Sequence, residues 1–269
     1  MANGKWRGNI VMEHIFVSQN GHQFLIFPEL IKAGLSICMT TGDMDVGTST
    51  NGDIESIRNN LKDAFDVLGS EPKLLYNGYQ EHTDNLEIIN SLDQVLVSPY
   101  GRYIPSTDGL ITDMTKVCLL TRFADCVPIV LFDRKNKVHA NIHSGWKGTL
   151  LKIGEKGVHV MKKDFNSKGE DIIALIGPSI GRDDFEVEWD VASRFIEIHG
   201  HIPEAVRKKN ESKFLVDLQL INKQLLLNAG IREENIHIIP ISTFSDSRFH
   251  SYRRDQASYG LMGMLTMIK

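Results

Sequence analysis

The pattern of apolar and polar positions predicts both strands and helices along this chain. From residue 10 to residue 39, short apolar runs such as 24–27 alternate with turn formers, which predicts strands joined by turns. Apolar residues recur at helical spacing over residues 54–68, and Gly69 follows, so we predict a helix that ends there. Residues 43–53 are rich in Gly, Asp, Ser and Thr and are predicted to form a surface loop.

The middle of the chain carries three predicted strands. Residues 117–120 and 128–132 are apolar runs of strand length on either side of segment 121–126. In a third strand over 137–143, Val138, Ala140 and Ile142 occupy one face, while His139, Asn141 and His143 occupy the other. His143 therefore comes at the end of its strand, immediately before a glycine-containing turn.

The last third of the chain mixes further helices and strands. Apolar residues over 150–161 predict a helix that Thr149 caps, with backbone N–H groups available to an anion. Strands are predicted over 172–176 and 236–241, and a helix over 217–229 with Gly230 just after its end. Because strands and helices do not alternate strictly and no internal repeat is present, we predict one α/β or α+β layered domain spanning 1–269, rather than a Rossmann sheet.

Composition narrows the function classes. With 269 residues and 42% hydrophobic composition the chain can bury a large core, and a net charge of -4 without a basic stripe argues against nucleic-acid and membrane partners. The three cysteines are too few, and odd in number, for a disulfide framework. The first 14 residues lack the apolar stretch of a signal peptide, and no segment has the about 20 apolar residues of a membrane span, so we expect a cytoplasmic protein.

His82, Cys126 and His143 are the candidate metal ligands. A catalytic zinc site uses three protein ligands and leaves a fourth position for water. Cys126, at a break between two apolar runs, and His143, at a strand end, can project from one end of a sheet, whereas His82 has to arrive from a loop. His139 lies about 13 Å back along the strand, too far to share one ion.

The spacing of these three residues matches no compact metal motif, so other interpretations stay open. Cys126 can be a small buried core residue, with the histidines as ordinary polar residues. Alternatively, Cys126 and His143 can form the nucleophile and base of a metal-free cysteine hydrolase.

Two segments resemble a known family. Residues 121–128 contain Ala-Asp-Cys-x-Pro, and residues 143–149 contain His-x-Gly-Trp-Lys-Gly-Thr. Both resemble a bacterial and animal family long labelled polyphenol oxidase or laccase-domain (multicopper polyphenol oxidoreductase) proteins and now described as purine nucleoside phosphorylases, in which arginine stands at the position of Lys147. Further matches are Gln80-x-His82 and the segments 108–112, 177–181, 185–187, 217–222 and 251–255.

This resemblance implies a layered α/β/β/α-type sandwich with a mixed sheet, and a catalytic zinc held by His82, Cys126 and His143. It also implies phosphorolysis of adenosine, inosine, guanosine and methylthioadenosine to the free base and ribose 1-phosphate, together with deamination of adenosine. The sequence departs from the family at Cys38, where many members have arginine, and at Ser242-Thr243, where a Cys-Thr pair is frequent. The region up to about residue 60 matches poorly.

Five further residues are candidates for the chemistry. Zinc-bound water attacking C6 of adenine needs a carboxylate to move a proton; Asp125 is a candidate, and a structural role is the alternative. Phosphate needs cations: Lys147 and Arg254 are candidates for catalysis and Arg253 for substrate binding, with a solvated turn lysine and an arginine paired with Asp255 as the alternatives. Trp146 is a candidate for stacking on the purine, or it simply packs against the sheet.

Two rival functions remain. Copper, the alternative metal, fits the older family label, but laccase chemistry needs several coppers and many histidines, whereas this chain offers the trio and an isolated His199-x-His201. A binding or regulatory member that keeps the metal without turnover is the other rival. The expected partners are purine nucleosides and phosphate, and the expected assembly is a monomer or a homodimer.

Overall fold

The computed structural model describes residues 12–90 and 96–269 of the chain. Most of the N-terminal segment in which we expected no signal peptide lies outside the described residues. The strands are β1 (Ile15–Gln19), β2 (His22–Ile26), β3 (Leu35–Thr40), β4 (Leu74–Gly78), β5 (Leu86–Ile88), β6 (Leu96–Ser98), β7 (Gly101–Ile104), β8 (Gly109–Thr112), β9 (Val117–Phe123), β10 (Val127–Asp133), β11 (Val138–Ser144), β12 (Ile172–Ile176), β13 (Glu186–Glu188), β14 (Val206–Lys208), β15 (Lys213–Val216), β16 (Ile236–Ile238) and β17 (Met262–Ile268). The helices are α1 (Pro28–Ala33), α2 (Ile54–Leu68), α3 (Trp146–Leu150), α4 (Ile153–Asp164), α5 (Trp189–His199), α6 (Leu218–Asn228) and α7 (Tyr252–Asp255), with 3-10 turns η1 (Glu233–Asn235) and η2 (Gln256–Ser258).

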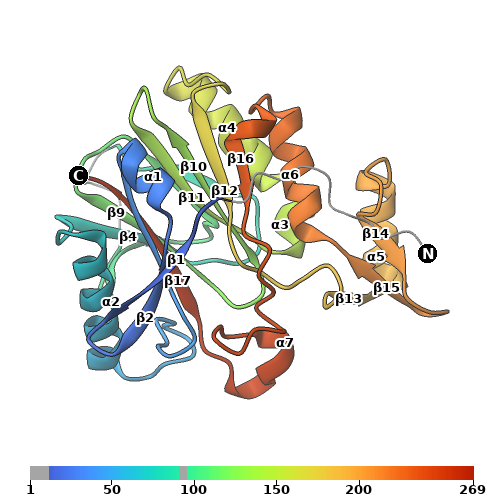
Figure 1. Ribbon diagram of the computed structural model, residues 1–269, viewed down its shortest axis with the longest axis horizontal. Helices are drawn as coiled ribbons and strands as arrows, with labels where there is room; N and C mark the ends of the chain where they lie inside the picture. The colour runs from blue at the N-terminus through green and yellow to red at the C-terminus, as the bar shows by residue number, and fades with distance from the viewer. Residues whose placement is uncertain (1–11, 91–95) are drawn as a thin grey trace.

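Two large mixed sheets form the centre of the molecule. The larger has the strand order β1-β2-β3-β17-β9-β4-β7-β6, and the smaller has the order β16-β12-β10-β11-β8-β5. Most neighbours are antiparallel, but β4 runs parallel to β7 and β9, β5 runs parallel to β8, and β12 runs parallel to β16. A third sheet, β13-β15-β14, carries α5 at the side of the molecule (Figure 1).

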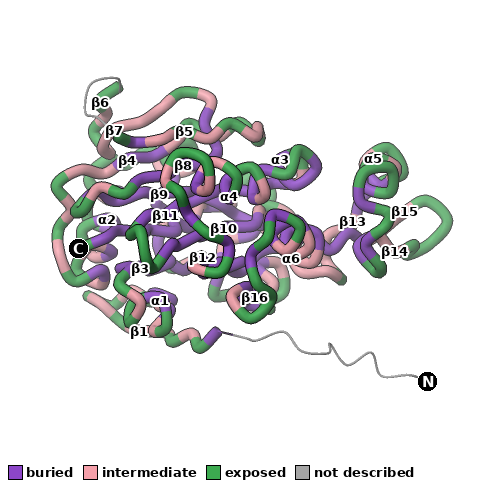
Figure 2. Tube along the Cα trace, turned by 90° about the horizontal axis from the view of Figure 1, so that it is seen from above, coloured by how far each residue is buried: buried purple, intermediate pink, exposed green. Residues whose placement is uncertain are grey.

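The alternation of side chains explains the layers. Along β10, Ile129 and Leu131 join the core cluster beneath α4 and α6, whereas Val130 and Phe132 join the cluster between the two large sheets. Helix α2 packs its buried side chains on the outer face of the larger sheet. The buried strands therefore lie inside covering helices (Figure 2), and the predicted α/β/β/α-type sandwich with mixed sheets is confirmed.

Local predictions succeed where apolar spacing and caps agree. Helix α2 spans Ile54–Leu68, with Asp53 accepting hydrogen bonds at its start and Gly69 in the left-handed region at its end. In β11, His139 and Asn141 do face the larger sheet, where they bond to Thr266 and to backbone carbonyls. The strand predicted over 236–241 is shorter and ends at Ile238.

Two local predictions are wrong. The segment expected to contain only strands and turns includes helix α1, which Pro28 begins and Gly34, with φ 108°, ends. Thr149 does not cap a helix: it lies inside α3, its hydroxyl contacts Ser144 and Asn222, and α4 begins after Lys152 at φ 62°. The anion site expected at a Thr149 cap is therefore absent.

Within the described residues, every helix is too short or too polar to cross a membrane.

Candidate metal centre and its cavity

Cys126 lies where the chain crosses from one large sheet to the other. Strand β9 belongs to the larger sheet and β10 to the smaller, and only residues 124–126 join them. This turn is possible because Asp125 takes up the left-handed conformation at φ 78°. The Cys126 thiol is consequently presented at the edge shared by both sheets, partly exposed to solvent.

His143 arrives beside this turn through strand pairing. In the β10–β11 register it is opposite Pro128, two residues after Cys126. Its ring is buried, and its Nδ1 is 2.8 Å from Oδ1 of Asp108. A carboxylate that accepts from Nδ1 fixes the tautomer and leaves Nε2 as the metal-binding nitrogen.

His82 comes from the loop between β4 and β5, as expected. Its φ is 60°, and its Nε2 lies 3.7 Å from the Cys126 sulfur. The carboxylate of Asp108 holds this loop too, because it accepts hydrogen bonds from the backbone N–H groups of residues 81, 82 and 83 and from the Thr83 hydroxyl. One buried carboxylate thus positions two of the three candidate ligands.

The three donor atoms lie close enough together to share a single metal ion. They all lie within 4.8 Å of one another, while ligands 2.0–2.3 Å from a zinc are separated by about 3.3–3.8 Å. The space between them depends on Gly145, since a Cβ at this position would lie 2.5 Å from His82 Cδ2 and 3.2 Å from the Cys126 sulfur. Only glycine leaves both side chains where they are.

The charges within this cluster favour a thiolate. Burial by itself raises the pKa of the Cys126 thiol, but His143 and His82 outweigh burial and lower it to about 6. Burial by itself lowers the pKa of His143, but the charges and hydrogen bonds of Cys126 and Asp108 outweigh burial and raise this pKa to about 9. For Asp108, hydrogen bonds from His143 and Thr83 outweigh burial and lower the pKa to about 2. Metal binding requires a deprotonated sulfur, which this surrounding provides.

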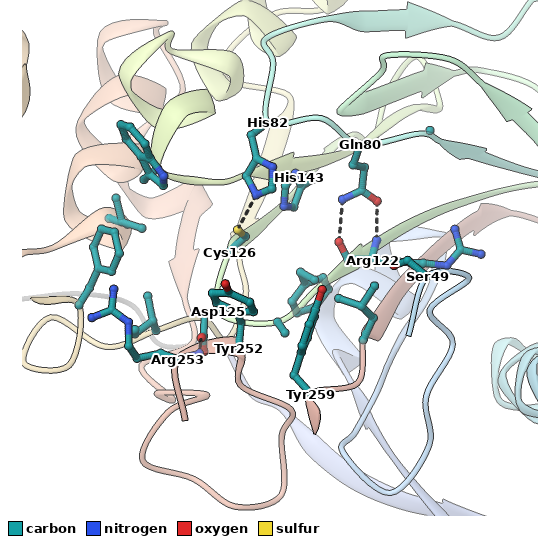
Figure 3. A pocket seen from close by; sticks show the side chains of 18 of the residues that line it. Ser49, Gln80, His82, Arg122, Asp125, Cys126, His143, Tyr252, Arg253 and Tyr259 are labelled. Carbon is teal, nitrogen blue, oxygen red and sulfur yellow. Dashed lines mark hydrogen bonds between the residues drawn. The ribbon is translucent and has the colours of Figure 1, made fainter. Parts of the chain in front are cut away.

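The cluster forms one wall of a cavity of about 1030 Å³ (Figure 3). The cavity is large enough for a drug-sized or nucleoside-sized ligand. Among the residues proposed from the sequence, the lining contains His82, Asp125, Cys126, His143, Trp146 and Arg253. Thr48 and Ser49, from the N-terminal region that matches the family poorly, also line it.

Arg253 and Arg254 point to different surroundings although they are neighbours. The Arg253 guanidinium lies 5.6 Å from the Phe185 ring centre and donates to the Glu186 carbonyl, at the cavity wall. Arg254 lies outside the lining, where its guanidinium bonds to Asp255 and to the carbonyls of residues 243, 244 and 249. Arg254 therefore braces the chain around the cavity.

Trp146 and Lys147 also separate. Trp146 is half-buried and lines the cavity next to the metal cluster. Lys147 is exposed and lies outside the lining, with its Nζ 5.6 Å from the centre of the Trp146 ring. Two other residues at which the chain departs from the family have local contacts: Cys38 is buried in the core against α2, and the Ser242 hydroxyl bonds to Asp184.

Three residues of this site carry roles that reasoning from residue types did not assign. Asp108 and Gly145 are described above, and the Gln80 amide bonds to both the backbone N–H and the carbonyl of Arg122, which ties the His82 loop to β9. All three lie in segments that match the family pattern, and that pattern was the only signal for them.

A mixed α/β sandwich that gathers Cys and two His at the wall of a cavity defines a candidate metalloenzyme. Residues 32–269 match the family described as multi-copper polyphenol oxidoreductase laccase, and the chain belongs to this family.

Similar proteins carry names from nucleoside chemistry. A purine nucleoside phosphorylase of Bacteroides thetaiotaomicron is 31% identical over 211 residues, covering 77% of this chain and 78% of the relative. An adenosine deaminase, RL5, of an unknown prokaryotic organism is 31% identical over 159 residues, covering 58% of this chain and 60% of the relative. The crystal structure of a hypothetical protein, YfiH, of Bacillus licheniformis superimposes with a TM-score of 0.85 at 27% identity, covering 94% of this chain and 99% of that chain.

Proposed function

We propose that this protein is a zinc-dependent purine nucleoside phosphorylase that also deaminates adenosine. Its proposed substrates are adenosine, inosine, guanosine and methylthioadenosine, each with phosphate. The convergence of His82, Cys126 and His143 at the wall of a nucleoside-sized cavity is the observation that carries the proposal. The names of the phosphorylase and deaminase relatives support the same chemistry.

The protein's own residues would hold and orient the metal. His82, Cys126 and His143 supply two nitrogens and one sulfur, and Asp108 keeps the His143 tautomer and the His82 loop in place. A zinc ion bound there would lower the pKa of a water ligand to about 7 and act as a Lewis acid. Because His82, Cys126 and His143 would supply three donors, a fourth ligand position would be left for water or substrate.

Phosphorolysis depends on positioning phosphate beside the ribose and stabilising the departing base. Arg253 is the proposed phosphate-binding residue because its guanidinium lies at the cavity wall, held by the Glu186 carbonyl. Trp146 lines the same cavity as the metal cluster, and we propose that it contacts the purine. The phosphate roles of Lys147 and Arg254 stay predictions, as does proton transfer by Asp125.

Copper oxidation of phenols is a weaker candidate. Within residues 12–90 and 96–269 a single cluster of at least three His, Cys, Asp or Glu donors meets the geometry of a metal site. Reduction of dioxygen to water needs four electrons, so one three-ligand site is a poor match for laccase chemistry. The metal-free hydrolase uses the same Cys126 and His143 atoms, and metal analysis separates it from the proposal.

The test uses purified full-length protein whose zinc content has been measured. With inosine and phosphate we expect hypoxanthine and ribose 1-phosphate, and with adenosine in phosphate-free buffer we expect inosine. Chromatography of the products, with phosphate omitted or added, distinguishes the two activities. Absence of both products from zinc-loaded protein would reject the proposed function.

A further inference from the structure

The Asp125 carboxylate accepts three hydrogen bonds from the C-terminal part of the chain. Its Oδ1 accepts from the Thr243 hydroxyl at 2.7 Å. Its Oδ2 accepts from the Ser251 hydroxyl at 3.0 Å and from the backbone N–H of Arg253 at 2.7 Å. The residue is 8% exposed, so these three bonds replace solvation by water.

The backbone of Asp125 makes this arrangement more specific. Its φ of 78° is a conformation in which glycine is the least strained residue, yet an aspartate stands there. Its carbonyl accepts from the N–H of Ile180, which joins the turn to the loop after β12. Aspartate is one of the non-glycine residues that adopt this conformation most readily, so the same residue can form both the turn and the three bonds of its carboxylate.

The segment that bonds to Asp125, residues 251–253, also carries side chains that line the cavity. The hydrogen bond to the Arg253 N–H fixes the residue whose guanidinium meets the cavity, and Tyr252 lies beside it, packed edge-on against Tyr259 with ring centres 5.0 Å apart. Both tyrosines line the cavity (Figure 3). Asp125 itself immediately precedes the candidate ligand Cys126.

We propose that Asp125 is a positioning residue. Its carboxylate connects the turn at residues 124–126 to the cavity wall formed by Tyr252 and Arg253, and this connection holds the Arg253 guanidinium in position to bind an anion. The identity of that anion as phosphate rests on the proposed function. Proton transfer would require the carboxylate to exchange a proton with substrate, but its oxygens already accept three donors from residues 243, 251 and 253. Asp125 acts through Arg253, and its replacement changes phosphate binding before it changes turnover.

The test compares Asp125→Asn with Arg253→Ala and with the double variant. In Asp125→Asn one oxygen becomes an NH2 group: facing Ser251 and Arg253 it would lose the bond from the Arg253 N–H, and facing Thr243 it would leave these two donors on a neutral amide oxygen, which accepts more weakly than a carboxylate. We expect the KM for phosphate to rise by about tenfold, with a smaller change in kcat and unchanged zinc content. Added to Arg253→Ala, the substitution should raise this KM no further. Asp113→Asn, at an exposed aspartate, is the matched control.

A readout independent of activity accompanies the kinetics. Hydrogen exchange of the amides of residues 251–255 should accelerate in Asp125→Asn and stay unchanged in Asp113→Asn. If Asp125→Asn does not fold, Thr243→Val removes one of the three donors without touching the turn, and should raise both the exchange and the phosphate KM more weakly.

One result would overturn the inference in favour of proton transfer by Asp125. In that case Asp125→Asn would lower the kcat of deamination and remove one limb of its pH profile, while the KM for phosphate and the hydrogen exchange stay unchanged. Because exchange is measured without substrate, a wild type that shows no phosphorolysis rejects the proposed function while the exchange data still decide the role of Asp125.

Discussion

The two walls of the cavity are built in different ways. On the metal side, Cys126 and His143 come directly from the ends of buried paired strands, and the buried Asp108 locks the third ligand. On the opposite side, the short segments α7 and β13 carry exposed side chains, with Tyr252 55% exposed and Glu186 paired with Lys209 at the surface. The metal wall is therefore built from paired strands, whereas the wall around Tyr252 and Arg253 is built from short elements that side-chain hydrogen bonds hold in place.

The comparison predicts that damage to the metal side abolishes function, while damage to the other side changes substrate binding.

The largest effect is expected for Cys126→Ser. Serine replaces the thiolate by a hydroxyl with a much higher pKa, so zinc affinity should fall by more than about 100-fold and turnover should fall with it. Elemental analysis and product chromatography measure the two losses. Cys118→Ala, in the core against α2, is the control and should keep both zinc and turnover. Full activity in zinc-free Cys126→Ser would refute the role of the sulfur.

Gly145→Ala should come next. The added methyl group would meet the His82 ring at 2.5 Å, so the loop has to move and the three donors separate. We expect zinc affinity to fall by about 10–100-fold with little change in the melting temperature, as measured by zinc titration and thermal unfolding. Gly52→Ala, where a Cβ has nothing within 4 Å, is the matched control. Equal zinc affinity in both variants would show that the donors do not converge as described.

Asp108→Asn removes the charge but keeps the shape of the residue that joins His82 and His143. An amide can still accept some of its bonds, so we expect a fall of about 10-fold in zinc affinity, at the low end for an outer partner of a metal ligand. Competition with a zinc chelator measures it. An unchanged affinity would mean that the ligands are positioned without this carboxylate.

On the opposite wall, Arg253→Ala should raise the KM for phosphate by about 10-fold or more while zinc content stays constant. Lys147→Ala provides the comparison, because Lys147 is exposed and lies outside the cavity lining. Steady-state kinetics with varied phosphate separate the two. A larger effect for Lys147→Ala would move the phosphate site to the start of α3.

The smallest effect concerns stability behind the metal wall. Burial lowers the pKa of His139 from 6.5 to about 3, so the unfolded chain binds more protons than the folded one between these values. The contribution of neutral His139 to the free energy of unfolding is therefore fully present above about pH 6.5 and is lost as the pH falls towards 3. In His139→Gln this part of the decrease should vanish, which urea unfolding between pH 7.5 and 5 can measure. An unchanged pH slope would place a different group behind the acid sensitivity.

The sequence predicted the buried helices and strands better than the connections between them. Alternation in β11 and helical spacing in α2 predicted faces and ends, because each pattern depends on neighbouring residues alone. That β9 and β10 belong to different sheets depends on long-range pairing, and no local pattern reveals it. For the same reason the sequence did not predict that Asp108 holds both the His82 loop and His143, because these partners lie 25–35 residues away along the chain. The roles expected for Asp125, Lys147 and Arg254 rested on residue type and on position in the sequence, neither of which reveals which atoms a side chain contacts, and they stay predictions.

The most direct test of the central claim is X-ray absorption at the zinc edge on the purified, zinc-loaded protein. We predict one sulfur neighbour at about 2.3 Å and two imidazole nitrogens at about 2.0 Å, with the sulfur contribution lost in Cys126→Ser. A zinc environment of nitrogen and oxygen alone in the wild type would contradict the account.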